Sequence, residues 1–121
     1  MAALDRDTTF VSAVTLTEIA RGIAQLPTNR KRTSLADWLH ETKLIFADRI
    51  LPVDAHAAEL CGERQGLMLH QGVAVGLADG LIAATARIRQ LRVATRNVRD
   101  IVAAGAPAYD PWTSQFHEPA P

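Results

Sequence analysis

The chain has 121 residues, which is the size of one typical domain. Thirteen basic and thirteen acidic residues give a net charge of zero, which excludes a basic arm that coats nucleic acid by charge alone. No apolar run approaches the roughly 20 residues of a membrane-spanning helix, and the N-terminus lacks the basic and apolar regions of a signal peptide. Because Cys61 is the only cysteine, an internal disulfide is excluded and we expect a cytoplasmic protein.

The first half of the chain is expected to alternate strands with helices. Residues 9–14 are a short β-prone run, and Thr15 then has the pattern of a helix N-cap with Glu18 as its capping-box partner. The apolar spacing that follows predicts a helix, and a second apolar stripe predicts another helix over 30–47. Residues 49–53 are the next predicted strand.

The second half of the chain continues this alternation. Asp54 is expected to cap a helix that ends at Gly72, and another helix is expected to open between Gly76 and Gly80. The elements after it are a strand over 91–95, a short helix over 97–103 and a strand over 107–109. Because a helix lies between successive strands, the pattern predicts an α/β fold with a parallel sheet flanked by helices. The functional crevice of such a sheet lies at the carboxyl ends of its strands.

Three acidic residues lie near these predicted strand ends or in the helices beside them, namely Glu18, Asp79 and Asp100. Asp79 shares an apolar helix face with Ala83, where a carboxylate is costly unless a partner or a hard divalent cation compensates it. From the residues alone, ordinary alternatives stay open: a first-turn acid for Asp79, a capping-box acid for Glu18 and a solvated helix residue for Asp100. The histidines lack zinc-type spacing, and Cys61 has the pattern of a small core residue.

Several motifs, in order along the chain, resemble PIN-domain toxins of the VapC/FitB type. Residues 10–23 are similar to the second-strand segment of these toxins, and residues 77–86 are similar to the helix that carries their third acid. Residues 93–100 are similar to the strand and helix before their C-terminus, and Asp110-Pro111-Trp112 resembles their closing Asn-Pro-Trp. The resemblance covers about residues 5–112 and implies a PIN-like parallel sheet.

The resemblance implies a metal-dependent endoribonuclease that is the toxin of a type II toxin–antitoxin pair. It implies Mg²⁺ or Mn²⁺ bound by the acids at the catalytic and metal-binding positions of the motifs: Glu18, Asp79 and Asp100. Polar residues that would support the metal or contact RNA are Thr95, Arg96 and Asn97. The implied partners are a cognate antitoxin, an RNA substrate and a second copy of the chain in a homodimer, with no membrane.

The chain departs from the family pattern at its start. The family begins with a strand carrying Asp-Thr-Asn, whose Asp is a principal metal ligand, and this role is not transferred to Asp5 or Asp7. We therefore expect an N-terminally truncated PIN-like domain over 1–112 and a flexible C-terminal tail over 113–121. The truncation would reflect either a start codon assigned too far downstream or a truncated gene product. The alternative function is a catalytically impaired module that only dimerises or binds an antitoxin.

Overall fold

The computed structural model of the chain describes residues 4–120, without the side chain of Arg6, and divides into two compact units. The larger unit contains residues 53–120 together with Leu4 and Asp5, and the smaller unit contains residues 6–52. Residues 1–3 and 121, at the two ends of the predicted domain and tail, lie outside the described part. Among the described residues, no helix is both long enough and apolar enough to cross a membrane.

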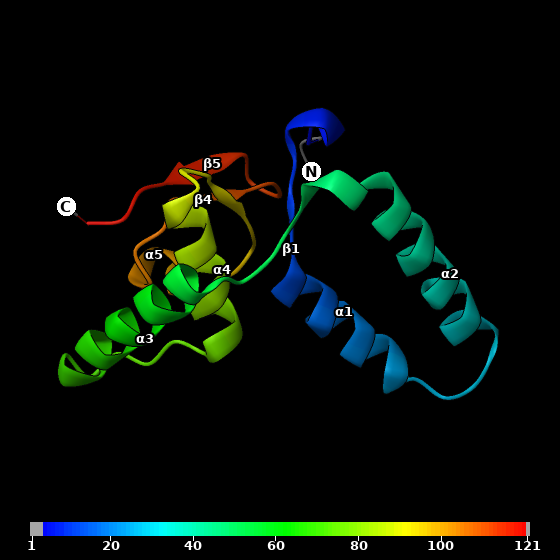
Figure 1. The fold of residues 1–121 in the computed structure, drawn as a ribbon, viewed down its shortest axis with the longest axis horizontal. Helices are drawn as coiled ribbons and strands as arrows, with labels where there is room; N and C mark the ends of the chain where they lie inside the picture. Colours follow the sequence, from blue (N-terminus) through cyan, green and yellow to red (C-terminus); the bar gives the residue numbers. More distant parts are fainter. Residues whose placement is uncertain (1–3, 121) are drawn as a thin grey trace. The chain divides into compact units, whose positions relative to one another are not determined.

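The smaller unit is a pair of helices joined to a pair of short parallel strands (Figure 1). Strand β1 (Val11–Ser12) pairs with strand β2 (Ile50–Leu51), with Val11 opposite Ile50. The elements between the strands are α1 (Ala13–Ala24), α2 (Arg30–Ile45) and a 3₁₀ turn (Ala47–Arg49), and another 3₁₀ turn (Arg6–Thr8) precedes β1. No described residue of α1 or α2 is fully buried.

Helix α1 begins earlier than the sequence predicts. Its N-cap is Ser12, whose hydroxyl oxygen accepts a hydrogen bond from the backbone N–H of Val14 at 3.1 Å. Thr15 lies inside the helix, so the predicted capping box between Thr15 and Glu18 is wrong. The β-prone run therefore contributes only two residues to a strand, because the helix takes over at Ala13.

The larger unit is a three-stranded sheet with three helices. Helices α3 (Ala55–His70) and α4 (Leu77–Ile88) pack against one another. The elements after them are β3 (Val93–Ala94), α5 (Val98–Ala103), β4 (Ala108–Asp110) and β5 (Gln115–His117). Strands β3 and β4 are parallel with α5 between them in the chain, and β5 is antiparallel to β4. The α/β class and the parallel pairing flanked by helices are as predicted, although the strands form two separate sheets.

Strand β5 lies within the segment that the sequence predicts to be a flexible tail. Phe116 is opposite Tyr109 of β4 in the antiparallel register, and their ring centroids are 4.7 Å apart. The guanidinium of Arg92 lies over the Phe116 ring and also pairs with the carboxylate of Glu118. Residues 115–118 are therefore held to the sheet by backbone pairing and side-chain contacts that no local sequence signal predicts.

Local signals do set the ends of helix α3. The carboxylate of Asp54 accepts a hydrogen bond from the backbone N–H of Ala57 at 2.9 Å, so Asp54 is the N-cap, as predicted. Gly72 has a φ of +74°, in the left-handed region that glycine adopts without steric cost. It ends the helix as the sequence predicts.

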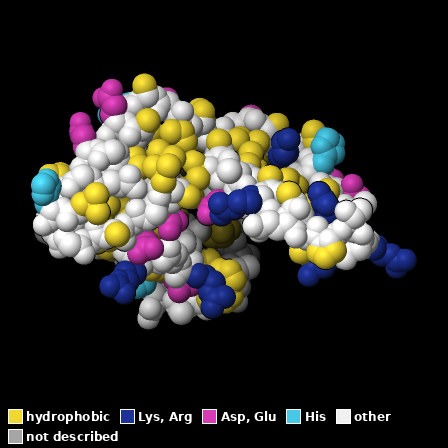
Figure 2. All heavy atoms as spheres, turned by 90° about the horizontal axis from the view of Figure 1, so that it is seen from below, with side chains coloured by type: hydrophobic (Ala, Val, Ile, Leu, Met, Phe, Trp, Pro, Cys, Tyr) yellow, Lys and Arg dark blue, Asp and Glu magenta, His cyan; other side chains and the backbone are white. Residues whose placement is uncertain are grey.

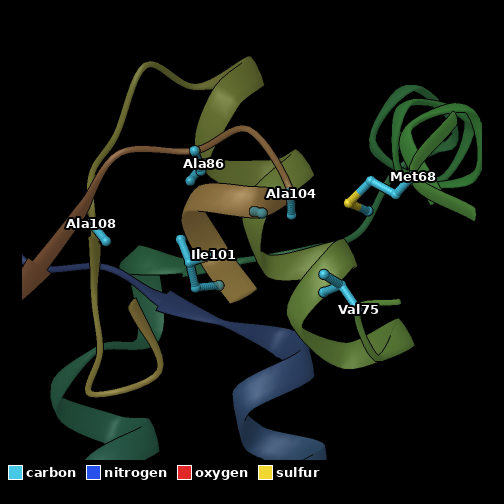
Figure 3. Packing of buried hydrophobic residues seen from close by; sticks show 8 residues of the cluster. Met68, Val75, Ala86, Ile101, Ala104 and Ala108 are labelled. Carbon is cyan, nitrogen blue, oxygen red and sulfur yellow. The ribbon is translucent and has the colours of Figure 1, made fainter. Parts of the chain in front are cut away.

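The core of the larger unit consists mainly of small side chains (Figure 3). Ile101 is the largest fully buried side chain and is 1% exposed, while several alanines of α4 and of the segment around β4 have no measurable exposure. Met68 and Val75 complete the same cluster from the α3 side. Small side chains allow the helices and strands to approach closely, so the position of each backbone segment is set by its neighbours.

The close packing of α3 against α4 explains why the residue after Asp79 is a glycine, Gly80. A Cβ atom on Gly80 would lie 2.9 Å from the sulfur of Cys61 and 3.2 Å from the side-chain nitrogen of Gln65. The Gln65 amide also donates a hydrogen bond to the backbone oxygen of Val75 at 3.0 Å. Burial raises the pKa of the Cys61 thiol, which fits the prediction that this cysteine is a core residue.

Candidate active site

The candidate site is organised by Asn97, which lies between the end of β3 and the start of α5. The backbone N–H of Asn97 donates a hydrogen bond to the hydroxyl oxygen of Thr95 at 2.9 Å. The backbone N–H of Thr95 in turn donates to the carbonyl oxygen of Tyr109 in β4, also at 2.9 Å. These two bonds fix the turn to the sheet, so that Asn97 occupies a defined position at the carboxyl end of β3.

The amide of Asn97 connects two carboxylates from different helices. Its Nδ2 donates to Oδ2 of Asp79 at 2.7 Å and to Oδ2 of Asp100 at 3.1 Å. Asp79 lies in the first turn of α4, and Asp100 lies in the first turn of α5. Asn97 is the N-cap residue of α5, but its side chain makes no capping bond because the amide is directed to the two acids instead. The three side chains form what we call the Asp79–Asn97–Asp100 group.

The two carboxylates lack a basic partner among the described side chains. Ion pairs in that part of the chain join Arg49 to Asp48 and Arg92 to Glu118, and neither includes Asp79 or Asp100. Asp79 and Asp100 are both partly buried, and two like charges that approach one another are unfavourable without compensation. The two hydrogen bonds from the Asn97 amide and the N-terminal ends of the helices supply part of that compensation. A bound cation would supply the rest.

The oxygen donors of this group fit a hard divalent cation. No group of three or more Asp, Glu, His or Cys side chains is arranged to hold a metal ion among residues 4–120. Mg²⁺ does not require such a cage, because it keeps several waters and is usually bound by one or two carboxylates together with substrate phosphates. Carboxylate ligands also suit Mn²⁺. Asp79 and Asp100 therefore form a donor pair of the right chemistry for either ion.

Glu18, the remaining predicted acid, belongs to the smaller unit. It is exposed on α1, six residues after the Ser12 N-cap. The Asp79–Asn97–Asp100 group lies wholly in the larger unit. The role of Glu18 as a metal ligand consequently stays a prediction from the family resemblance.

Arg96 and Trp112 form a second contact at the same edge of the sheet. The guanidinium carbon of Arg96 lies 4.7 Å from the centroid of the Trp112 ring. The backbone N–H of Trp112 donates to the Asp110 carboxylate at 2.8 Å, which holds the turn after β4. The sequence predicts Arg96 as an RNA contact but gives Trp112 no role. Its place in the Asp110-Pro111-Trp112 motif, shortly after a predicted strand, was the available signal.

Comparison with known proteins identifies relatives along most of the chain. The family model of the PIN domain matches residues 1–104. The toxin FitB of Neisseria gonorrhoeae is 36% identical over 104 residues, which cover 85% of this chain and 75% of FitB. The VapC ribonuclease Y4jK of Sinorhizobium fredii is 35% identical over 107 residues, which cover 88% of this chain and 76% of that protein.

Among solved structures, FitAB bound to an IR36 DNA fragment has the same fold. The match has a TM-score of 0.83 and 32% sequence identity, and it covers 95% of this chain and 81% of the matched chain. The extent of the family match and the identity to two curated relatives are sufficient to establish the family. The chain belongs to the PIN-domain family and is homologous to the FitB and VapC toxins of toxin–antitoxin systems.

Proposed function

We propose that the chain is a metal-dependent endoribonuclease and the toxin component of a toxin–antitoxin pair. The observation that carries this proposal is the pair of carboxylates, Asp79 and Asp100, joined by the Asn97 amide at the carboxyl end of β3. This edge of a parallel sheet is where ligands of α/β proteins bind. The homology to a VapC ribonuclease and to the toxin FitB supports the same reaction class.

In this mechanism the protein holds and orients the charges around one RNA phosphate. Asp79 and Asp100 are the residues that would hold Mg²⁺ or Mn²⁺, while Asn97 donates a hydrogen bond to Oδ2 of each acid. When bound, such an ion lowers the pKa of water and offsets negative charge on a phosphodiester. Thr95 fixes the backbone of Asn97 and thereby the spacing of the two carboxylates. Glu18 is the proposed third acid, by homology alone.

Cleavage of a labelled single-stranded RNA tests this proposal. Wild-type protein is incubated with Mg²⁺, with Mn²⁺ or with EDTA, and is compared with Asp79→Asn and Glu63→Gln. Glu63 is an exposed carboxylate on α3 of the same unit, so its amide variant is the matched control. We expect wild type and Glu63→Gln to cleave only with metal, and Asp79→Asn to fall to background.

Two outcomes would contradict the nuclease proposal. One is metal-dependent cleavage by Asp79→Asn at the wild-type rate, and the other is the absence of cleavage by the wild-type chain. Circular dichroism and thermal unfolding of Asp79→Asn establish that any loss of activity does not reflect loss of the fold. Retained folding is expected because Asp79 makes its hydrogen bond at the edge of the unit rather than in the core.

We also propose that an antitoxin covers part of the smaller unit. The side chains of Trp38, Leu44 and Ile45 on α2 are 49%, 65% and 46% exposed. Trp38 and Ile45 are seven residues apart and so share one helix face. Hydrophobic side chains are also exposed at several other places, on the face shown in Figure 2. Grouped apolar surface of this kind marks sites of protein association, and the solved relatives include FitAB and VapBC complexes.

The same exposed surface favours the alternative function, a module that binds an antitoxin or a second copy of the chain without catalysis. Co-expression with a candidate antitoxin, followed by co-purification, measures the binding part of the proposal. Stable association without metal-dependent RNA cleavage would support the non-catalytic alternative. Association together with cleavage that is inhibited in the complex would support a toxin with its antitoxin.

A further inference from the structure

We propose that Trp112 and Arg96 together form a stacking site for one unpaired RNA base, beside the Asp79–Asn97–Asp100 group. The inference rests on the proposed function in that it takes RNA as the ligand. It adds a binding site for one base and names the two residues that would form it. Neither the mechanism above nor the family resemblance gives Trp112 a role.

The geometry of the pair leaves ring surface for a ligand. The Arg96 guanidinium lies over the Trp112 ring at 4.7 Å, a distance typical of a cation–π contact. Although Arg96 contacts the ring, Trp112 remains 53% exposed, which is a large exposed area because tryptophan is the largest aromatic side chain. Arg96 is itself exposed. An aromatic ring held by one contact and open elsewhere is the arrangement on which nucleic-acid bases stack.

The ring is also held at a defined place in the fold. Trp112 is two residues beyond Asp110, the last residue of β4, and its backbone N–H is bonded to the Asp110 carboxylate at 2.8 Å. Arg96 is two residues beyond Ala94, the last residue of β3. Because β3 and β4 are parallel, both residues emerge from the same edge of the sheet.

That edge is the one that carries the candidate acids. Arg96 is followed directly in the chain by Asn97, whose amide bonds Asp79 and Asp100. Adjacent Cα atoms are about 3.8 Å apart. A short run of nucleotides could therefore extend from the carboxylates to the stacking pair. A phosphate at the carboxylates and a base on Trp112 would therefore belong to neighbouring parts of one strand.

The charges at this edge favour a nucleic acid over an apolar partner. Arg96 and Arg99 are both exposed residues and are neighbours in the chain of Asn97 and Asp100, and guanidinium forks pair well with phosphate oxygens. A protein partner that buried Trp112 would have to desolvate Arg96 with it, because the two side chains are stacked. A base on the ring leaves the guanidinium free to contact the adjoining phosphate.

Binding measurements in EDTA separate this site from catalysis. The chain has only two tryptophans, so Trp38→Phe leaves Trp112 as the sole tryptophan reporter of fluorescence. The probes are a short unstructured RNA and the same sequence as a duplex. We expect the single strand to quench Trp112 fluorescence. We expect Trp112→Ala to weaken its binding about tenfold, or ~1.4 kcal/mol, and to change duplex binding far less.

Conservative and matched variants keep the test independent of folding. Trp112→Phe retains an aromatic face and should bind the single strand within a few-fold of wild type. Leu69→Ala removes another exposed apolar side chain, on α3 of the same unit, and should leave binding unchanged. Unchanged single-strand binding by Trp112→Ala, equal losses for single strand and duplex, or no RNA binding by the wild-type chain would each overturn the stacking site.

The nuclease proposal and the stacking site can fail separately. RNA cleavage that persists in Trp112→Ala with an unchanged KM removes the stacking site and leaves the nuclease intact. Quenching of Trp112 by single-stranded RNA in a chain that cleaves nothing keeps the stacking site and removes the nuclease. Loss of antitoxin binding with normal RNA binding in Trp112→Ala assigns this surface to a protein partner and overturns the inference.

Discussion

The two units of the chain bury their apolar residues to very different degrees. In residues 53–120, one cluster of buried side chains lies between α3 and α4 and another includes α4 and α5, where Ile101 is 1% exposed. In residues 6–52, no described residue of either long helix is fully buried, and Leu44 is 65% exposed. Removal of apolar surface from water is the main favourable contribution to folding. We infer that the larger unit supplies most of the stability.

This difference bears directly on the candidate site. The Asp79–Asn97–Asp100 group is built on α4 and α5, whose inner faces form the core. Catalytic geometry requires side chains supported by well-packed neighbours, and the larger unit provides that support. Glu18 is carried by the unit with little buried surface. Predictions that compare the two units therefore test the structural basis of the proposed function.

The largest expected difference comes from removing one apolar side chain in each unit. Ile101→Ala deletes the largest fully buried side chain and should lower the free energy of unfolding by about 2–5 kcal/mol. Leu44→Ala deletes an exposed side chain and should change it by less than about 0.5 kcal/mol. Chemical denaturation of both variants measures the two values. Similar losses would show that the burial difference does not set the stability.

A smaller effect is expected from adding one methyl group at the contact between α3 and α4. Gly80→Ala places a Cβ 2.9 Å from the Cys61 sulfur and should destabilise the protein by about 1–3 kcal/mol. Gly66→Ala on α3 meets nothing within 4 Å and should be neutral or stabilising by up to ~1 kcal/mol. Thermal unfolding of the pair measures the contrast. A stabilising Gly80→Ala would contradict the close approach of α3 and α4.

The smallest of these effects concerns the start of α3. Asp54→Ala removes the carboxylate that accepts the Ala57 N–H bond and should cost ~1 kcal/mol. Asp54→Asn keeps a side-chain oxygen for the same bond and should retain most of the stability. Denaturation curves of both variants provide the comparison. An equal loss in the two variants would exclude capping as the source of the effect.

The features that the sequence predicts well are those governed by nearby residues. The Asp54 cap and the glycine at the end of α3 depend on atoms within a few positions, and both are found where expected. The sequence predicts Thr15 instead of Ser12 as the N-cap of α1, because the hydroxyl of either residue can cap a helix. Only the length of β1 decides between them. Strand β5 was missed because the contact of Phe116 with Tyr109 forms only after β4 is in place.

The candidate site could be predicted only in part, because its contacts join segments that are far apart in the chain. Motif positions single out Asp79, Asn97 and Asp100 as residues, but their spacing in the chain does not reveal that one amide joins both carboxylates. That arrangement needs α4 and α5 to pack together through their small residues. The contact of Arg96 with Trp112 likewise depends on the parallel pairing of β3 with β4.

The most direct test of the account is the binding of Mn²⁺ by the whole chain. Electron paramagnetic resonance of free Mn²⁺ gives the number of ions bound and their affinity for wild type, Asp79→Asn, Asp100→Asn and the control Glu63→Gln. The account predicts that either Asp variant loses the tightest Mn²⁺ site while Glu63→Gln keeps it. Wild-type affinity in both Asp variants would contradict the assignment of the metal to the Asp79–Asn97–Asp100 group.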